Sequence, residues 1–284
     1  MRYLLLCLLV LGLIASFAMA DQTAVTKMIK SMPGAIAYYD LEGDYKDALG
    51  KAPAGQEVGD KSAFGWISGV NGGKAVTINS AQYVGSFIDI PAPIGSIFDT
   101  PKISVIVWVK LFPKDGWQAI CERSNIWYLE TEAKPAEWKD NAVVWRIYDP
   151  VAVGGGGPGQ VRDNANVAIK NDQWYQLAFT FDGSVIKCYV NGEEKIKRDY
   201  VVQLGPIAGT PDPPPAGKGK NYNLSLGTWQ QRDDWFNGAI DDFAYFGTVL
   251  SAEQIKALYD AMLASPSPVK AEGKLTVTWG EIKK

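Results

Sequence analysis

The sequence contains no histidine among its 284 residues. A serine or cysteine nucleophile activated by an imidazole base is therefore excluded, and so is the imidazole-rich kind of zinc site. Any catalysis would have to depend on carboxylates, tyrosine or lysine. Any bound metal would be a hard cation held by oxygen ligands.

Cysteine is scarce, with three residues in the whole chain. Cys7 lies in the apolar N-terminal run, whereas Cys121 and Cys188 lie in apolar, strand-like stretches. In an exported protein these last two could form a disulfide, or they could remain as thiols that pack like small hydrophobic side chains. Both alternatives stay open, because a sequence does not show whether two cysteines meet the geometry of a disulfide.

The sequence also lacks a basic tract. Its formal net charge is −3 and its pI is about 5.2. Nucleic acid and anionic membrane surfaces are therefore poor candidate partners, and we expect no nucleic-acid partner.

Long apolar runs are absent except at the start, MRYLLLCLLVLGLIASFAMA. Arg2 precedes the run, and Ala18 and Ala20 supply the small residues that a signal peptidase requires. The run is shorter than the ~20 apolar residues of a membrane anchor. We therefore expect residues 1–20 to be a cleaved signal peptide and the mature protein to be secreted, either periplasmic or extracellular, with no later transmembrane segment.

What the sequence has in abundance is short runs of β-branched and aromatic residues separated by turn residues, from about residue 35 to residue 247. In WYQLAFTFDGSVIKCYVNGEE, two alternating segments flank Asp182-Gly183, and Asn191-Gly192 closes the second, which predicts a β-hairpin. About a dozen such strands with little helix indicate an antiparallel sandwich or barrel. Two stacked sheets account best for the alternation and for the number of aromatic residues to be buried.

One helix is expected after the last strand. Ser251 and Gln254 have the spacing of a capping box. An apolar stripe at helical spacing follows and should dock on a sheet; it consists of Ile255, Leu258, Tyr259 and Met262. Residues 21–34 are expected to be a lead-in segment, 35–264 the β-domain and 265–284 a linker with a strand-like tail. That tail either joins the sheet or pairs with another molecule.

Three motifs resemble one family. ISVIVWVK is similar to a strand of LamG-like jelly-roll domains, DQWYQLAFTFDGSVIKCYVNGE to their central hairpin, and LSLGTW with FNGAIDDFAYFGTVLSAEQIKALY to their closing strand and helix. The opening AIAYYDLEGDYKDALG resembles their first strand and turn. This resemblance, over about residues 35–262, implies an all-β, two-sheet antiparallel jelly roll of the concanavalin A-like lectin and glucanase type, with one C-terminal helix. The fold does not define a function, because it carries lectins, enzymes and adhesion modules alike.

The closing strand contains two adjacent carboxylates, Asp241 and Asp242. Because side chains alternate along a strand, we expect one to point inward and the other outward. The first could brace the fold by accepting hydrogen bonds. Alternatively, the resemblance implies a Ca²⁺ site near the sheet rim, for which the first turn could supply further oxygen ligands. The predicted calcium ligands are Asp40, Asp44, Asp47 and Asp241.

Catalysis is a further alternative, since laminarinase-type enzymes of this superfamily use carboxylates on one strand. Glu130 and Glu132 have strand spacing and should lie on one face, like the pair of a retaining glycosidase. The third acid of the enzyme motif is missing, because Lys134 and Pro135 follow.

Glycan sites in proteins combine exposed aromatic faces with polar side chains around them. A polar loop bracketed by two indoles is the best candidate here, with other strand-end tryptophans as further candidates. The predicted ligand-binding residues are Trp229, Arg232, Trp235, Trp127 and Trp145, and Trp117, Trp138, Arg123 and Arg146 belong to the same class. Core packing is the alternative for each indole, since tryptophan is largely buried on average.

The sequence therefore favours a secreted, non-catalytic LamG-like module that binds carbohydrate or another extracellular partner, with Ca²⁺ as a possible cofactor. A glycoside hydrolase of the laminarinase-like type that uses strand carboxylates is the alternative.

Overall fold

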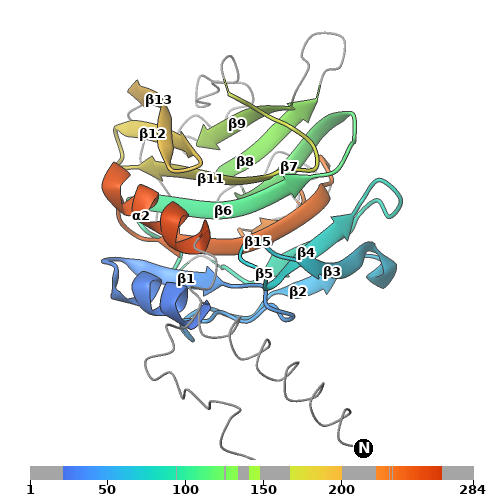
Figure 1. Cartoon of the computed structure of the whole chain (residues 1–284), viewed down its shortest axis with the longest axis horizontal. Helices are drawn as coiled ribbons and strands as arrows, with labels where there is room; N and C mark the ends of the chain where they lie inside the picture. The colour runs from blue at the N-terminus through green and yellow to red at the C-terminus, as the bar shows by residue number, and fades with distance from the viewer. Residues whose placement is uncertain are drawn as a thin grey trace, which may run out of the picture.

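The structure is a computed structural model of the whole chain, and it describes residues 22–93, 95–124, 126–133, 141–147, 167–199, 222–229, 231 and 233–263. Two antiparallel sheets stack face to face in this part of the chain (Figure 1). The sandwich that the sequence predicts is confirmed. The predicted signal peptide and the tail at residues 265–284 lie outside the described residues.

The first sheet has eight strands, with β13, β12, β11, β6, β15, β4 and β3 in spatial order and β1 paired with β15. Its strands are β1 (Ala35–Tyr39), β3 (Phe64–Ser68), β4 (Lys74–Asn79), β6 (Ile103–Leu111), β11 (Trp174–Phe181), β12 (Val185–Val190), β13 (Glu193–Asp199) and β15 (Asn237–Phe246). The long strand β15 is the centre of this sheet, because it pairs with β6 along one side and with both β4 and β1 along the other.

The second sheet has seven strands in the order β10, β9, β8, β7, β14, β5 and β2. Its strands are β2 (Gln56–Val58), β5 (Phe87–Ile90), β7 (Gly116–Arg123), β8 (Trp127–Ala133), β9 (Asn141–Ile147), β10 (Ala168–Ile169) and β14 (Leu224–Leu226). A short 3-10 helix, η1 (Lys61–Ala63), follows β2.

The main hydrophobic core lies between the sheets and draws its side chains from the inner faces of both. In β8, for example, Trp127 and Leu129 belong to this core, while Tyr128 between them does not. Alternation along the strands therefore gives the second sheet one apolar inner face and one outer face that can carry polar and aromatic groups.

A second apolar layer covers the outer face of the eight-stranded sheet. The helix α2 (Ala252–Leu263) buries Ile255, Leu258 and Met262 of the predicted stripe there, while Tyr259 is partly buried against the same layer. Its capping box is formed, since Gln254 N–H donates to Ser251 Oγ at 3.2 Å and Ser251 N–H to Gln254 Oε1 at 2.8 Å. A further helix, residues 22–31, packs on the same layer beside β1 (Figure 1). This helix was not predicted from the sequence, which we had assigned over residues 21–34 to a lead-in segment. No described helix is long and apolar enough to cross a membrane.

The predicted hairpin is confirmed as β11 and β12, in register from Leu177 opposite Val190 to Phe181 opposite Ile186. Gly183 and Asn191 adopt positive φ angles of 98° and 53° in the turns that follow β11 and β12. Asn and Gly tolerate this conformation better than other residues, which is why these dipeptides mark the turns.

A β-bulge interrupts β15 at the two carboxylates. Asp242 has a φ of 50°, and the register with β6 shifts between Asp241 and Ala244. Ile240 and Phe243 on either side both face the main core, so the two intervening carboxylates both lie on the outer side of the sheet. The prediction that one points inward and one outward is therefore wrong, because a bulge adds one residue and resets the alternation.

Candidate functional site

The outer face of the seven-stranded sheet carries a row of polar and aromatic side chains across five adjacent strands. Residues paired across strands share a face of the sheet. The register places Asp89 opposite Ser225, Ser225 opposite Glu122, Glu122 opposite Tyr128 and Tyr128 opposite Arg146. We call Asp89, Ser225, Glu122, Tyr128 and Arg146 the transverse row.

Arg146 organises one end of this row. Its guanidinium carbon lies 4.7 Å from the centre of the Tyr128 ring and 5.5 Å from that of the Trp117 ring. Its Nη2 also pairs with Glu130 Oε1 at 3.2 Å. A guanidinium between two aromatic faces and a carboxylate is held in one orientation, because the cation–π and ionic contacts act together.

Trp229 reaches the same place from the loop between β14 and β15. Its ring meets Tyr128 edge to face, with ring centroids 6.4 Å apart. We call Trp117, Tyr128, Arg146 and Trp229 the aromatic–arginine cluster. Three of its members are partly exposed and Tyr128 is buried, so a ligand would meet two indoles and a guanidinium supported from below by the phenol.

The loop that carries Trp229 is fixed to the sheet on both sides. Gln231, at a φ of 57°, donates its amide to Asp89 at 2.7 Å. Asn223 donates to both oxygens of the same carboxylate at 3.0 and 2.8 Å. Burial raises the pKa of Asp89, and these hydrogen bonds from Asn223 and Gln231 lower it in turn. Asp89 therefore acts as the acceptor that holds the loop against the sheet.

Lys114 holds the other side of the loop. Its ammonium donates to the carbonyl of Trp117 at 3.0 Å and to that of Trp235 at 2.6 Å. Burial lowers the pKa of Lys114, against the opposing effect of the Asp234 charge. One half-buried side chain thus joins the strand that carries one indole of the cluster to the loop that carries the other.

The structure separates the predicted ligand-binding residues into three groups. Trp229 belongs to the cluster. Trp127 and Trp145 are 0% and 2% exposed in the core between the sheets, so neither has a face for a ligand, because strand alternation turns both inward. Trp235 is partly exposed and packs on Phe87, with ring centroids 6.2 Å apart.

Other candidates from the sequence divide in the same way. Arg232 and Trp138 lie outside the described residues. Arg123 is 1% exposed and has a structural role, since it pairs with Asp99 and donates to the carbonyl of Phe98 at 2.6 Å. Sequence reasoning missed Tyr128, Glu122 and Asp89 as members of the face, although the alternation of β8 contains the signal for Tyr128.

The two glutamates proposed for catalysis do share this outer face. Glu130 pairs with Val144 and Glu132 with Ala142 in an unbroken register between β8 and β9, so both point to the same side. They are 2% and 3% exposed. The prediction of a same-face pair is confirmed, and Glu130 is engaged with Arg146.

The four predicted calcium ligands have separate roles. Asp47 is buried and accepts four backbone N–H groups, from Tyr38 at 2.7 Å and Leu49 at 3.1 Å on Oδ1 and from Lys51 at 2.6 Å and Ala52 at 2.8 Å on Oδ2. Its two oxygens are thus committed to tying β1 to the loop that follows it.

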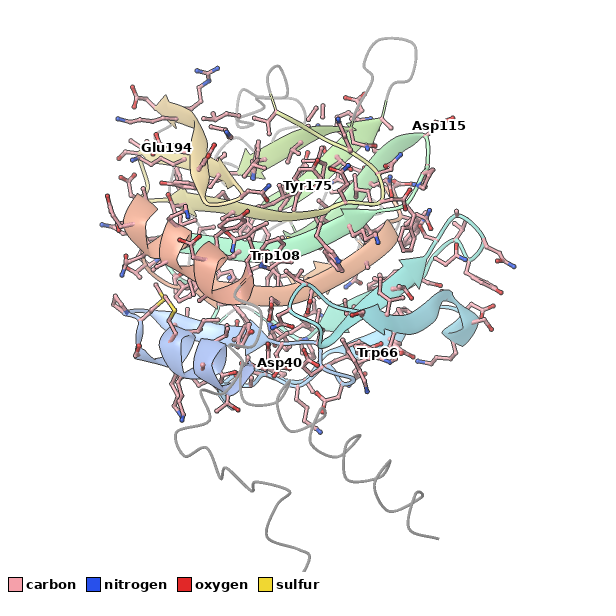
Figure 2. The ribbon with its side chains drawn as sticks, in the orientation of Figure 1. Asp40, Trp66, Trp108, Asp115, Tyr175 and Glu194 are labelled. Carbon is pink, nitrogen blue, oxygen red and sulfur yellow. The ribbon has the colours of Figure 1, made fainter. Side chains whose placement is uncertain are left out.

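Asp44 and Asp40 lie in the same first turn. Asp44 is exposed and pairs with Lys46 at 2.7 Å, and hydrogen bonds from Lys46 lower its pKa. Asp40 directly follows β1 (Figure 2), and burial raises its pKa. Among the described residues no group of three or more acidic or cysteine side chains is placed to hold a metal ion. The predicted set of ligands is therefore not brought together.

Asp241 and Asp242 are both 1% exposed beneath the helix of residues 22–31 and the turn before β4. Asp241 accepts the Val70 N–H at 3.0 Å. A Cβ at Gly69 would collide with the Asp241 carboxylate, so the turn requires glycine there. Burial, followed by the charge of Asp242, raises the pKa of Asp241 well above its ordinary range.

Asp242 accepts hydrogen bonds from the Tyr38 hydroxyl and from the Gln22 amide, the latter at 2.9 Å. Asn71 in turn donates to Gln22 Oε1 at 2.7 Å. Burial raises the pKa of Asp242 to about 7, although the hydrogen bonds from Tyr38 and Gln22 lower it. The donors around this pair are protein groups, which matches the bracing role among the alternatives for these carboxylates.

The two cysteines of the β-domain are not joined in a disulfide, and both are buried in the main core. Cys121 lies in β7 and Cys188 in β12, on opposite sheets. They behave as small hydrophobic side chains, which was one of the two alternatives left open by the sequence.

Solved structures with this fold include one domain of an arabinanase and two domains that are described as binding domains. Domain 4 of AbnA, a GH43 extracellular arabinanase from Geobacillus stearothermophilus solved in complex with arabinotriose, is 21% identical, with a TM-score of 0.55 over 79% of this chain and 98% of that one. The botulinum neurotoxin type G receptor binding domain is 15% identical, with a TM-score of 0.53 over 80% of this chain and 51% of that one. The binding domain of paraclostridial mosquitocidal protein 1 is 12% identical, with a TM-score of 0.57 over 82% of this chain and 53% of that one. The chain thus spans about half the length of the neurotoxin domain and of the mosquitocidal protein domain, and at these identities the likeness shows the fold.

A search of curated protein sequences gives no match. A family model described as the concanavalin A-like lectin/glucanases superfamily matches residues 80–256, which is more than half of the chain and includes every strand from β5 to β15. On this match, together with the two-sheet antiparallel fold, the chain belongs to the concanavalin A-like lectin/glucanase superfamily.

Proposed function

We propose that the protein is a secreted, non-catalytic module that binds carbohydrate through the outer face of the seven-stranded sheet. The observation that carries this proposal is the aromatic–arginine cluster, in which Trp117, Arg146 and Trp229 present partly exposed planar groups from three separate elements. Indole faces stack on the C–H faces of sugar rings, and a fixed guanidinium donates to ring or hydroxyl oxygens.

The relatives of known structure support a binding role. The arabinanase domain was solved with arabinotriose, and the toxin domains are binding domains by name. Arabinotriose and other neutral oligosaccharides are therefore suitable first probes, while an extracellular protein receptor is the other kind of partner for this fold.

Binding should depend on the cluster. We expect Trp229→Ala and Arg146→Ala each to weaken binding to the best saccharide on a glycan array at least tenfold, because each removes a planar group that contacts the ligand. Arg198→Ala on the exposed edge strand β13 removes the same charge far from the cluster and should bind like the wild type. The measurement is isothermal titration of the mature protein, and equal affinity in all three variants would refute the site.

The alternative of a glycoside hydrolase is favoured by one observation, the same-face pair Glu130 and Glu132. The same saccharides can be assayed for new reducing ends. If the wild type releases reducing ends from these saccharides and Glu130→Gln does not, the protein is a glycoside hydrolase and not a non-catalytic binding module. Calcium forms no part of the proposal, because Asp47 is committed to backbone donors and the described residues contain no grouped set of ligands.

Secretion rests on the predicted signal peptide, residues 1–20. The expected result is an exported protein whose N-terminal sequence begins at Asp21, as determined by Edman degradation or mass spectrometry. Recovery of the protein with Met1 retained and only in the cytoplasm would contradict this proposal.

A further inference from the structure

We propose that a stacked tyrosine–tryptophan pair at the edge of the sandwich, Tyr45 and Trp66, forms a second saccharide-binding site, which takes a neutral sugar ring. This site is separate from the aromatic–arginine cluster. It lies where the outermost strand of each sheet, β3 in one and β2 in the other, comes to the end of the sandwich.

The first observation is the exposure of Trp66. Its side chain is 37% exposed on β3, and Figure 2 shows it on the β3 side of the molecule. Among the described residues it is the one aromatic in the set of exposed large hydrophobic side chains, the others being Val58, Val84, Ile97 and Leu263. An indole is costly to leave in water, because it is the largest apolar side chain.

The second observation is that the indole is held in place. Its ring stacks on that of Tyr45, with centroids 5.4 Å apart and planes at 29°. Tyr45 packs against the main core and donates its hydroxyl to Glu57 Oε1 at 2.6 Å. One face of Trp66 therefore rests on a fixed support, and its exposed part can meet a ligand with little loss of side-chain freedom on binding.

The third observation is the pair of polar groups beside the rings. Glu57 Oε2 pairs with the ammonium of Lys61 at 3.1 Å, and Lys61 also donates to the Glu57 carbonyl at 3.0 Å. The Glu57 side chain is 23% exposed and that of Lys61 69%. A fixed carboxylate and an exposed ammonium offer an acceptor and donors to vicinal hydroxyls, and their charges cancel, which favours a neutral sugar over a charged one.

The site is distinct from the cluster by its place in the sheet. Two strands, β14 and β5, separate β2 from β7, which carries Trp117. At ~4.8 Å between neighbouring strands, this is about 14 Å. In addition, Glu57 is opposite the core residue Ile88 and Trp66 opposite the core residue Val76. These side chains therefore lean toward the gap between the sheets, whereas the cluster lies on the outer face.

The test uses the mature protein labelled with 5-fluorotryptophan and observed by fluorine NMR. The Trp66→Phe and Trp229→Phe variants assign the two signals, and thermal melting checks that each variant is folded. Arabinotriose, xylotriose and laminaritriose are titrated separately. We expect the Trp66 signal to move along a saturating curve with at least one of them, also in Arg146→Ala, and Trp66→Ala to weaken that binding at least tenfold. Glu57→Gln keeps an acceptor for the Tyr45 hydroxyl and should weaken the binding of that trisaccharide about threefold.

Two results would overturn this second site. One is a Trp66 signal that does not move with any of the three sugars up to 20 mM. The other is a signal that moves only with protein concentration, which would make the β3 edge a contact between two copies of the chain. If the Trp229 signal responds while that of Trp66 stays fixed, the proposed function is supported and the second site is refuted. If only the Trp66 signal responds, the proposed role of the aromatic–arginine cluster in saccharide binding is refuted instead.

Discussion

Replacing Asp47 by alanine is expected to lower the free energy of unfolding by ~3 kcal/mol or more, as measured by guanidinium-induced unfolding. The carboxylate accepts four backbone N–H groups, two on each oxygen, and its side chain is buried. Hydrogen bonds to a charged group are worth about 1.5–3 kcal/mol each, and donors that lose a buried acceptor keep the full cost of desolvation. The individual losses are not additive, since all four donors share one group.

Two further variants show whether this loss comes from the acceptor role. Asp47→Asn retains one acceptor oxygen and should lose roughly half as much stability as Asp47→Ala. Asp44→Ala is the matched control, because it removes an exposed aspartate three residues earlier whose partner is the exposed Lys46. Exposed pairs contribute about 0–1 kcal/mol. Equal losses in Asp44→Ala and Asp47→Ala would contradict the bracing role.

The same unfolding experiment shows whether Asp47 stabilises the fold as a hydrogen-bond acceptor or as a ligand of a metal ion. If Asp47 acts only on backbone donors, the unfolding midpoint of the wild type is the same in 1 mM Ca²⁺ and in EDTA. A bound ion would instead stabilise the fold by about 2.7 kcal/mol at a hundredfold excess over its dissociation constant. A midpoint that falls in EDTA, together with loss of this fall in Asp47→Ala, would restore the calcium site predicted from the sequence.

The architecture could be predicted from the sequence because its signals are local. Asp182-Gly183 and Asn191-Gly192 define a hairpin through the backbone conformations that they allow, and Ser251 with Gln254 defines the start of α2 through reciprocal hydrogen bonds. The pairing of the first strand with the last, β1 with β15, is a long-range contact that no local signal in the sequence contains.

The site was less predictable, because it depends on which face of a strand each residue occupies. Trp127 and Tyr128 are neighbours in sequence, yet one enters the core and the other the transverse row. The positive φ of Asp242 had no counterpart in the sequence pattern, since aspartate rather than glycine occupies the bulge. The docking of Gln22 on a carboxylate 220 positions away is a tertiary contact that no local pattern contains.

The paired carboxylates of β15 should make the protein less stable as the pH rises from about 4 to about 7. Burial raises the pKa of Asp242 to about 7 and that of Asp241 well above its ordinary range, whereas in the unfolded chain both have a pKa near 3.9. Between these values the folded protein retains protons that the unfolded chain has released. The unfolding free energy therefore falls with increasing pH, by about 1.4 kcal/mol per pH unit for each retained proton.

Asp242→Asn removes one of these protons and should make the dependence on pH about half as steep. The asparagine oxygen can still accept hydrogen bonds from Tyr38 and Gln22, so the contact to the helix of residues 22–31 is retained. The measurement is the unfolding free energy by urea at pH 5, 6, 7 and 8, with Asp260→Asn, an exposed aspartate of α2, as the control. Asp260→Asn should keep the slope of the wild type. A wild-type stability that rises between pH 5 and pH 7, or a slope that is the same in Asp242→Asn, would mean that the pair is charged in the folded protein, and a cation would then be needed to balance two adjacent buried carboxylates.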